Sequence, residues 1–152
     1  MKKRTEIQPG RLAFINFIGS RRFKEMTVKS AAVVESIAVV SVPVSDQERA
    51  KSFYVDTLGM KLVRDDSSVP GMRWIQVAPS GGGTQLTLVT WFDSMPAGSL
   101  RGLVLRLSDV QRTYDALRKV GVKFDGPPTR QPWGLETVVY DPDGNGIVLQ
   151  QA

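Results

Sequence analysis

The sequence predicts an α+β fold made of two consecutive units that share the element order β-α-β-β-β. A Ser-Asp helix start and a glycine helix stop occur in each half, around residues 45–59 and 108–121. Short stretches rich in β-branched and alternating apolar residues surround each predicted helix, as is typical of strands. Repetition at this scale indicates two similar modules rather than a solenoid. The modules span about residues 36–90 and 101–151.

In the first module, Ile37–Val44 is predicted to be a strand because it is rich in β-branched residues. Ser45 and Glu48 match a capping box, which predicts the start of a helix. Gly59 suits the left-handed position that ends a helix. Helical spacing gives one buried face, formed by Ala50, Phe53, Tyr54 and Leu58. The strands expected after the helix are Lys61–Asp65, Met72–Ala78 and Gln85–Thr90.

In the second module, Leu103–Leu107 is the first predicted strand, and Ser108 with Gln111 forms a second capping box. Gly121 ends the helix, and residues 141–146 form a tight reversal from residues that tolerate turn geometry. The buried face of this helix is formed by Val110, Tyr114 and Leu117. The remaining strands are expected at Val122–Phe124, Glu136–Tyr140 and Ile147–Gln150.

The charge of the 152-residue chain is unevenly distributed. Residues 1–30 hold eight Lys or Arg and two Asp or Glu, a net charge of +6, whereas the remainder has a net charge of −1. A nucleic-acid-binding body usually carries a basic face. We therefore expect a basic extension, residues 1–30, followed by a single domain, residues 31–152, that does not bind nucleic acid.

The extension superficially resembles a signal peptide, because Lys2, Lys3 and Arg4 precede the apolar stretch 12–19. Asn16 interrupts that stretch, which is followed by two arginines rather than a small-residue cleavage site. The stretch is also too short to span a membrane. We interpret the extension as a segment that packs on the domain or on a partner, with no membrane contact.

The chain contains no histidine and no cysteine. The best transition-metal ligands are therefore missing, and disulfides are excluded. The lack of cysteine fits a cytoplasmic protein. The lack of histidine removes the usual proton shuttle at neutral pH. We expect no metal and no other cofactor.

Short strings in both halves match one known family. They are Val42–Asp46, Ala50, Phe53-Tyr54 and Leu58-Gly59 in the first half, and Ser108–Val110, Leu117, Gly121-Val122, Pro132–Gly134 and Asp141–Asn145 in the second. On these residues the chain resembles the vicinal oxygen chelate superfamily, which contains glyoxalase I, extradiol dioxygenases, and fosfomycin- and bleomycin-resistance proteins. The resemblance implies two βαβββ modules whose curved sheets form a cup for small molecules.

Metal-dependent members of that family carry His, Glu or Gln at four positions of the cup wall. The resemblance places these positions at Val39, Gln85, Gly102 and Val148. Three of these residues cannot coordinate a metal through a side chain, and divalent cations need several donors together. The sequence therefore predicts the non-metal branch of the family, similar to the bleomycin-resistance proteins.

Alternation along the strands divides their side chains between a helix-covered face and the cup. The residues expected to line the cup are Val39, Ser41, Gln85, Thr87, Gly102, Val104, Arg106, Val148 and Gln150, with Trp74 and Trp133 as aromatic contacts. Arg106 is the candidate anchor for an anionic ligand group. It could instead pair with Glu136, and either tryptophan could serve packing alone. Trp91, at the start of the linker, is a candidate dimer contact.

Two functions remain. In the first, the protein is not an enzyme but binds an organic small molecule, for which Arg106 would accommodate an anionic group, in order to sequester or sense it. In the second, it is a metal-free isomerase or lyase in which Arg106 stabilises charge and Glu136 or Tyr140 transfers a proton. No nucleophile–base pair is visible, which favours binding. The resemblance also implies a homodimer, the commonest oligomer.

Overall fold

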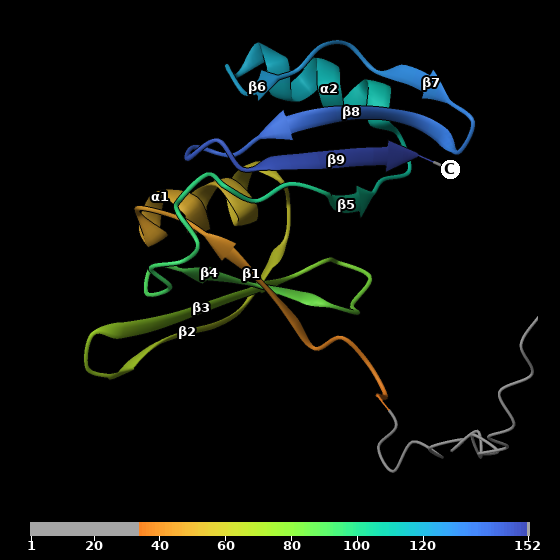
Figure 1. The fold of residues 1–152 in the computed structure, drawn as a ribbon. Coiled ribbons are helices and arrows are strands. Elements are labelled where there is room, and N and C mark those ends of the chain that lie inside the picture. The colour runs from red at the N-terminus through yellow and green to blue at the C-terminus, as the bar shows by residue number, and fades with distance from the viewer. Residues whose placement is uncertain (1–33, 152) are drawn as a thin grey trace, which may run out of the picture. The chain divides into compact units, whose positions relative to one another are not determined.

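The computed structural model of the chain describes residues 34–151 (Figure 1). Every feature described below belongs to the unit Val34–Ala152. The predicted basic extension, residues 1–30, lies outside the described residues. The described unit has an α+β fold with two sheets, as the sequence predicted.

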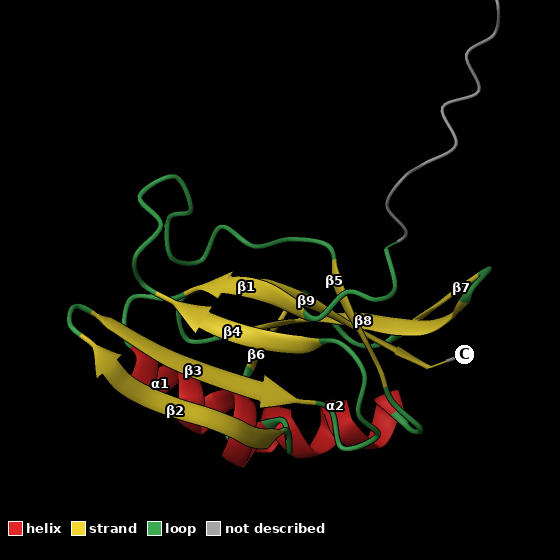
Figure 2. Cartoon of the chain, turned by 90° about the horizontal axis from the view of Figure 1, so that it is seen from below, coloured by secondary structure: helices red, strands yellow, loops and turns green. Residues whose placement is uncertain are grey.

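Four strands form the first sheet, sheet A, in the order β1-β4-β3-β2 (Figure 2). Their bounds are β1 Val39–Pro43, β2 Lys61–Val69, β3 Met72–Ala78 and β4 Gln85–Val89. β1 runs parallel to β4, and the other pairs are antiparallel. β1 is an edge strand, and β2 is longer than predicted.

The second sheet, sheet B, has the order β5-β9-β8-β6, with β7 also paired to β8. Its bounds are β5 Leu103–Arg106, β6 Lys123–Phe124, β7 Thr129–Gln131, β8 Gly134–Tyr140 and β9 Gly146–Gln151. Each module therefore has the predicted β-α-β-β-β order, and the second adds β7. The sequence prediction missed β7, which forms a short hairpin with β8 around Pro132 and Trp133.

The helices are α1 Gln47–Ser52, the π-helix η1 Phe53–Thr57 that continues it, and α2 Val110–Lys119. Both predicted capping boxes were wrong. The carboxylates of Asp46 and Asp109 cap α1 and α2, accepting hydrogen bonds from the backbone N–H of Arg49 and Arg112 at 3.0 and 2.8 Å. In each helix the capping Asp follows the predicted Ser by one residue. Its carboxylate oxygen accepts hydrogen bonds from backbone N–H groups as a Ser hydroxyl oxygen would. No helix among residues 34–151 is long and apolar enough to cross a membrane.

One hydrophobic core connects both modules. Val42, Ile75 and Leu88 of sheet A and Ile147 of sheet B are fully buried, as is Val110 of α2. Burial of an aliphatic side chain of this size contributes about 1.5–3 kcal/mol. Alternate residues on the same strands point away from this core, so each sheet has a helix-covered face and an opposite face, which we call its open face.

A buried polar cluster joins the modules where the β8–β9 turn meets β1. The Asn145 side chain donates to the backbone oxygen of Pro43 at 2.8 Å and to the Asp141 carboxylate at 2.7 Å. Its own oxygen accepts from the backbone N–H of Leu100 at 3.0 Å. Tyr54 donates its hydroxyl hydrogen to Asp141 at 3.0 Å. Burial and the Asp141 carboxylate raise the pKa of Tyr54, so the phenol stays protonated.

Beside this cluster, the Ser45 hydroxyl donates to Asp143, and Arg49 forms a 3.0 Å ion pair with the same carboxylate. Gly98 lies against this turn with φ +81, and a Cβ added there would approach the backbone oxygen of Asp143 to 2.1 Å. Only glycine fits both the backbone conformation and the contact. The sequence predicted that the Ser45 hydroxyl caps α1. It instead bonds to Asp143 of the second module and so helps to join the two modules.

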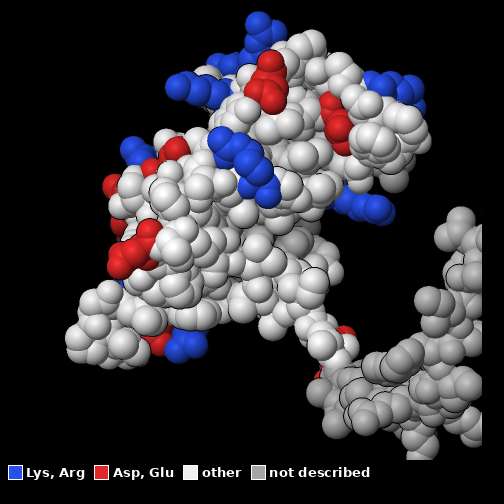
Figure 3. Space-filling model, viewed as in Figure 1, with Lys and Arg blue, Asp and Glu red and all other residues white. Residues whose placement is uncertain are grey.

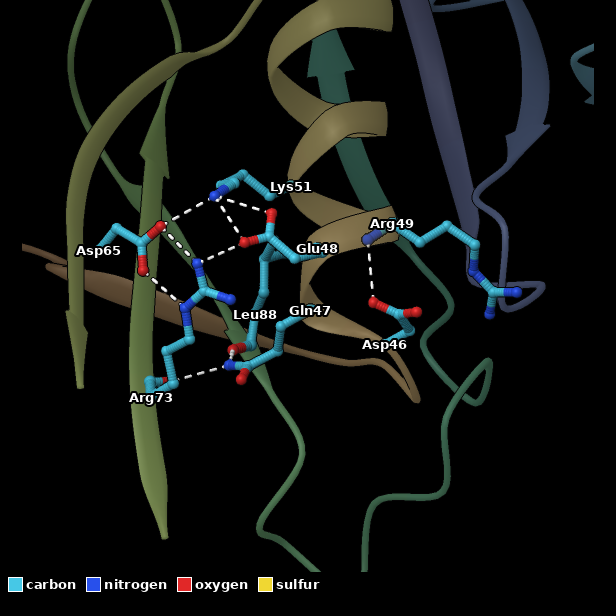
Figure 4. A network of polar contacts seen from close by, with 8 residues as sticks. All are labelled: Asp46, Gln47, Glu48, Arg49, Lys51, Asp65, Arg73 and Leu88. Atoms are coloured by element: carbon cyan, nitrogen blue, oxygen red, sulfur yellow. Dashed lines mark hydrogen bonds and ion pairs between the residues drawn. The ribbon is translucent and has the colours of Figure 1, made fainter. Parts of the chain in front are cut away.

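An ion-pair network ties α1 to the β2–β3 hairpin (Figure 4). Arg73 donates to Glu48 and Asp65, each at 2.7 Å, and Lys51 bridges the same two carboxylates. Hydrogen bonds from Arg73 and Lys51 lower the pKa of Asp65 to about 2. The network therefore keeps its charges at neutral pH, and it lies on the helix-covered face of sheet A, away from the open face.

Charges on the visible surface are mixed. Figure 3 shows Lys and Arg side chains interspersed with Asp and Glu and separated by wide uncharged areas on this face. The near-neutral charge of the sequence after residue 30 accounts for this pattern. The face shown carries no continuous basic surface of the kind that follows a nucleic-acid backbone.

Candidate functional site

The open face of sheet A carries a row of linked polar side chains. Trp74 donates its indole N–H to the side-chain oxygen of Gln76 at 2.8 Å. Gln76 in turn donates its amide to the side-chain oxygen of Gln85 at 2.5 Å. Trp74 and Gln76 lie on β3, and Gln85 lies on the neighbouring β4. These three residues form what we call the amide relay, which runs across the sheet.

The centre of this face contains an unused hydrogen-bonding group. Thr87 is paired in register with Ser41 on one side and Gln76 on the other. Its side chain is 1% exposed, and its hydroxyl is the buried side-chain polar atom without a partner among residues 34–151. Leaving such a group unpaired costs about 1–3 kcal/mol. The protein itself therefore leaves the buried Thr87 hydroxyl without a hydrogen bond.

Two indole rings lie next to the relay. Trp74 and Trp91 are stacked with ring centroids 6.0 Å apart and an interplanar angle of 26°. We call them the aromatic pair. Trp91 was expected at the start of the linker as a candidate dimer contact, and Gln76 was not expected among the site residues. The alternation Gln85, Thr87, Val89, Trp91 already places Trp91 on the same face, and this pattern could have identified it.

The open face of sheet B carries a row of charged and amide side chains. Register places Arg106 of β5 beside Gln150 of β9, and Gln150 beside Glu136 of β8. Glu136 accepts hydrogen bonds from the indole of Trp133 at 2.7 Å and from Gln150 at 3.5 Å. Among residues 34–151, Arg106 forms no salt bridge, so the predicted alternative pairing with Glu136 does not occur.

Tyr140, the other predicted proton-transfer residue, is engaged elsewhere. Its hydroxyl donates to the Asp125 carboxylate at 2.6 Å, and this hydrogen bond raises the pKa of Tyr140. The guanidinium of Arg101 lies 5.9 Å from the centre of its ring. A phenol that is held protonated and already donates its hydrogen is a poor general base at neutral pH.

The apolar site residues of the sequence prediction are exposed to different degrees. Val39 is 37% exposed, Val104 is 47% exposed and Trp133 is 60% exposed, whereas Val148 is only partly exposed. Gly102 lies just before β5 with φ +80, a conformation that favours glycine. The open faces of a single chain are thus accessible to solvent at two of the edge strands, β1 and β5.

A groove of ≈ 360 Å³ lies between β5, the end of η1 and the β3–β4 hairpin. It is lined by Val104 and Arg106 together with Leu58, Met60 and Ser80, among others. Its volume suits a small organic molecule. The groove brings together two predicted site residues of β5 but none of those on β3, β4 or β9.

The four positions where the family resemblance places metal ligands do not fit a metal. Val39 and Val148 offer only hydrocarbon, and Gly102 has no side chain. The oxygen of Gln85, the remaining candidate donor, already accepts the hydrogen bond from Gln76. No metal-assisted step can be derived from these residues.

Comparison with known proteins identifies the family. The family model of the Glyoxalase/Bleomycin resistance protein/Dioxygenase superfamily matches residues 36–149. TnmS3, an antibiotic binding protein from Streptomyces sp. CB03234, is 51% identical, with 79% of this chain and 98% of that chain covered and a TM-score of 0.74. A glyoxalase/bleomycin resistance protein from the same strain is 54% identical, with 76% and 100% covered and a TM-score of 0.69. YetH of Bacillus subtilis (strain 168), an uncharacterized protein, is 32% identical, with 78% and 100% covered.

Proposed function

Because the chain belongs to the Glyoxalase/Bleomycin resistance protein/Dioxygenase superfamily, we propose that it binds an organic small molecule on the open faces of its sheets without a metal ion. The observation that carries this proposal is Arg106, an exposed guanidinium beside Gln150 with no acidic partner among the described residues. Such a group is available for a carboxylate or phosphate of a ligand. The 51% identity with an antibiotic binding protein supports the same function.

The proposal is tested by titrating the protein with the antibiotic that TnmS3 binds and following indole fluorescence. We expect a saturable change in fluorescence, because Trp74 and Trp91 lie on the open face of sheet A and would report a ligand bound there. Chromatography of the mixture after long incubation should return the compound unchanged. Conversion of the compound, abolished in Glu136→Gln, would establish the metal-free enzyme instead.

Metal independence gives a prediction about stability. Since Val39, Gly102 and Val148 have no donor side chains, dialysis against a strong chelator should leave the melting temperature unchanged. Elemental analysis of the untreated protein should find only substoichiometric zinc, nickel, iron and manganese. A stoichiometric metal whose removal lowers the melting temperature would contradict this prediction.

We also propose a homodimer in which the partner covers the exposed edge strands β1 and β5. Val39 of β1 and Val104 of β5 are 37% and 47% exposed in the single chain. Light scattering should give about twice the 16.7 kDa chain mass. Val104→Lys should shift the protein toward monomer, because a lysine ammonium is costly to bury.

The matched control is Val120→Lys, at the end of α2, where the side chain is 74% exposed. This variant should remain dimeric. A parent protein of single-chain mass at micromolar concentration would refute the dimer without affecting the binding proposal.

A further inference from the structure

Asn145 is followed by Gly146, whereas Asn16, the other asparagine of the chain, is followed by a phenylalanine. Asparagine is one of the chemically labile residues of proteins. In an Asn-Gly pair the backbone nitrogen of the glycine can attack the side-chain carbonyl carbon of the asparagine, because no Cβ restricts the backbone rotation that this attack requires. Asn145 is therefore the residue of this sequence most prone to deamidation.

The fold blocks this attack by holding each of the groups that take part. The backbone N–H of Gly146 donates to the backbone oxygen of Leu100 at 3.0 Å, so the attacking nitrogen keeps its hydrogen. The side-chain oxygen of Asn145 accepts from Leu100, and its side-chain nitrogen donates to Pro43 and Asp141. Asn145 is also fully buried, away from water. The attacking nitrogen, the carbonyl and the leaving group are thus all protected in the closed joint.

The hydrogen bonds that protect Asn145 include those that join the modules. Pro43 belongs to the first module, and Asn145 and Asp141 belong to the second. An opening of this joint therefore frees the side chain, frees the Gly146 N–H and admits water in one event. Proteins open locally in this way even when they are stable overall.

We propose that Asn145 is a deamidation site that reacts only when the modules separate, and that the reaction makes the separation permanent. The Gly146 nitrogen loses its hydrogen to water and bonds to the side-chain carbon of Asn145. The bond from this carbon to the amide nitrogen breaks, so ammonia leaves and a succinimide ring remains. Water then opens the ring at either carbonyl and leaves aspartate or isoaspartate at position 145. Water is the co-reactant, and nothing is oxidised or reduced.

Neither product fits the closed joint. Aspartate at this position would place a second carboxylate where the Asn145 nitrogen now donates to Asp141 at 2.7 Å. Two like charges buried side by side disfavour the closed state, and the hydrogen bond to Pro43 is lost as well. Isoaspartate also inserts a carbon atom into the backbone of the turn at residues 141–146. The joint is therefore a one-way device that marks chains which have once opened.

The test incubates the full chain at mildly alkaline pH in native buffer and in urea above the unfolding midpoint. Peptide mapping by mass spectrometry should find Asn145 intact in native buffer. In urea it should show the mass gain of an amide converted to a carboxyl group, and it should react faster than Asn16. Gly146→Pro has no backbone N–H to lose at position 146, so in the same urea solution it should keep the Asn145 amide. This comparison does not require the variant to fold.

The rate in native buffer measures how often the joint opens. Tyr54→Phe removes the hydroxyl that hydrogen-bonds to Asp141. It should speed the modification of Asn145 about five- to thirtyfold, because the reaction follows the population of open chains. Gln111→Ala, on the exposed surface of α2, is the matched control and should leave the rate unchanged.

Dilution from urea tests whether the opening becomes permanent. Unmodified chains should recover the tryptophan fluorescence and the protease resistance of the parent protein, and modified chains should recover neither. Four results would overturn the inference: equal modification of Asn145 in native buffer and in urea, no modification in urea, modification of Gly146→Pro as fast as the parent, or modified chains that refold to the stability of the parent.

Discussion

Replacing Asn145 with alanine should lower the free energy of unfolding by about 2–4 kcal/mol. Asn145 is fully buried, and its side chain is hydrogen-bonded to the backbone of Pro43, to the backbone of Leu100 and to Asp141. The alanine variant leaves the Leu100 N–H without its partner and removes a donor from Asp141. Since Pro43 and Asn145 belong to different modules, the loss falls on the contact that holds the modules together.

Urea denaturation followed by tryptophan fluorescence measures this change. Tyr54→Phe removes only the hydroxyl that hydrogen-bonds to Asp141. It should therefore lower the free energy of unfolding by less, about 1–2 kcal/mol. Gln111→Ala, an exposed helix substitution, should stay within about 0.5 kcal/mol of the parent. An Asn145→Ala variant as stable as Gln111→Ala would show that the turn at residues 141–146 does not fix the modules.

Replacing Arg106 with alanine should weaken the binding of an anionic ligand by about 2 kcal/mol while leaving the fold intact. Removing one partner of a charge-assisted hydrogen-bonded pair costs on the order of 2–5 kcal/mol of binding free energy when the other partner is buried. Arg106 is exposed in the single chain, so we expect the lower end of this range. Its side chain lies outside the buried core, so the melting temperature should not change.

The binding of 2-naphthoate and of neutral 2-naphthamide, measured by calorimetry, isolates the charge. Arg106→Ala should weaken only the naphthoate, and Arg106→Lys should recover part of the loss because an ammonium lacks the bidentate fork. Arg112→Ala, on the exposed face of α2, is the matched control. Equal naphthoate affinity in the parent protein and in Arg106→Ala would assign Arg106 to a role other than ligand binding.

The elements of the fold could be predicted because their signals are local. Val42 and Ile75 are buried as strand alternation requires, and Ala50 lies on the buried helix face as helical spacing requires. The use of Ser45 could not be predicted, because Asp143, its hydrogen-bond partner, lies 98 residues away. The local sequence pattern predicted that Ser45 caps α1, whereas the Asp46 carboxylate caps it.

The geometry of the open faces could be predicted only where it depends on alternation along a single strand. Alternation correctly grouped Gln85 and Thr87 on one face, since period two is a local property of a strand. It could not show that Gln76 connects Trp74 to Gln85, because this relay depends on the register between β3 and β4. Register is set by pairing between distant segments.

The most direct test of metal-independent ligand binding is a crystal structure of the chelator-treated protein with the antibiotic that TnmS3 binds. We predict electron density for the intact compound against the open faces, with contacts to Arg106 or to the aromatic pair of Trp74 and Trp91. We also predict that no metal ion joins the compound to the protein. Density for the compound only on the helix-covered faces, or a metal bridging it to protein atoms, would contradict the proposed function.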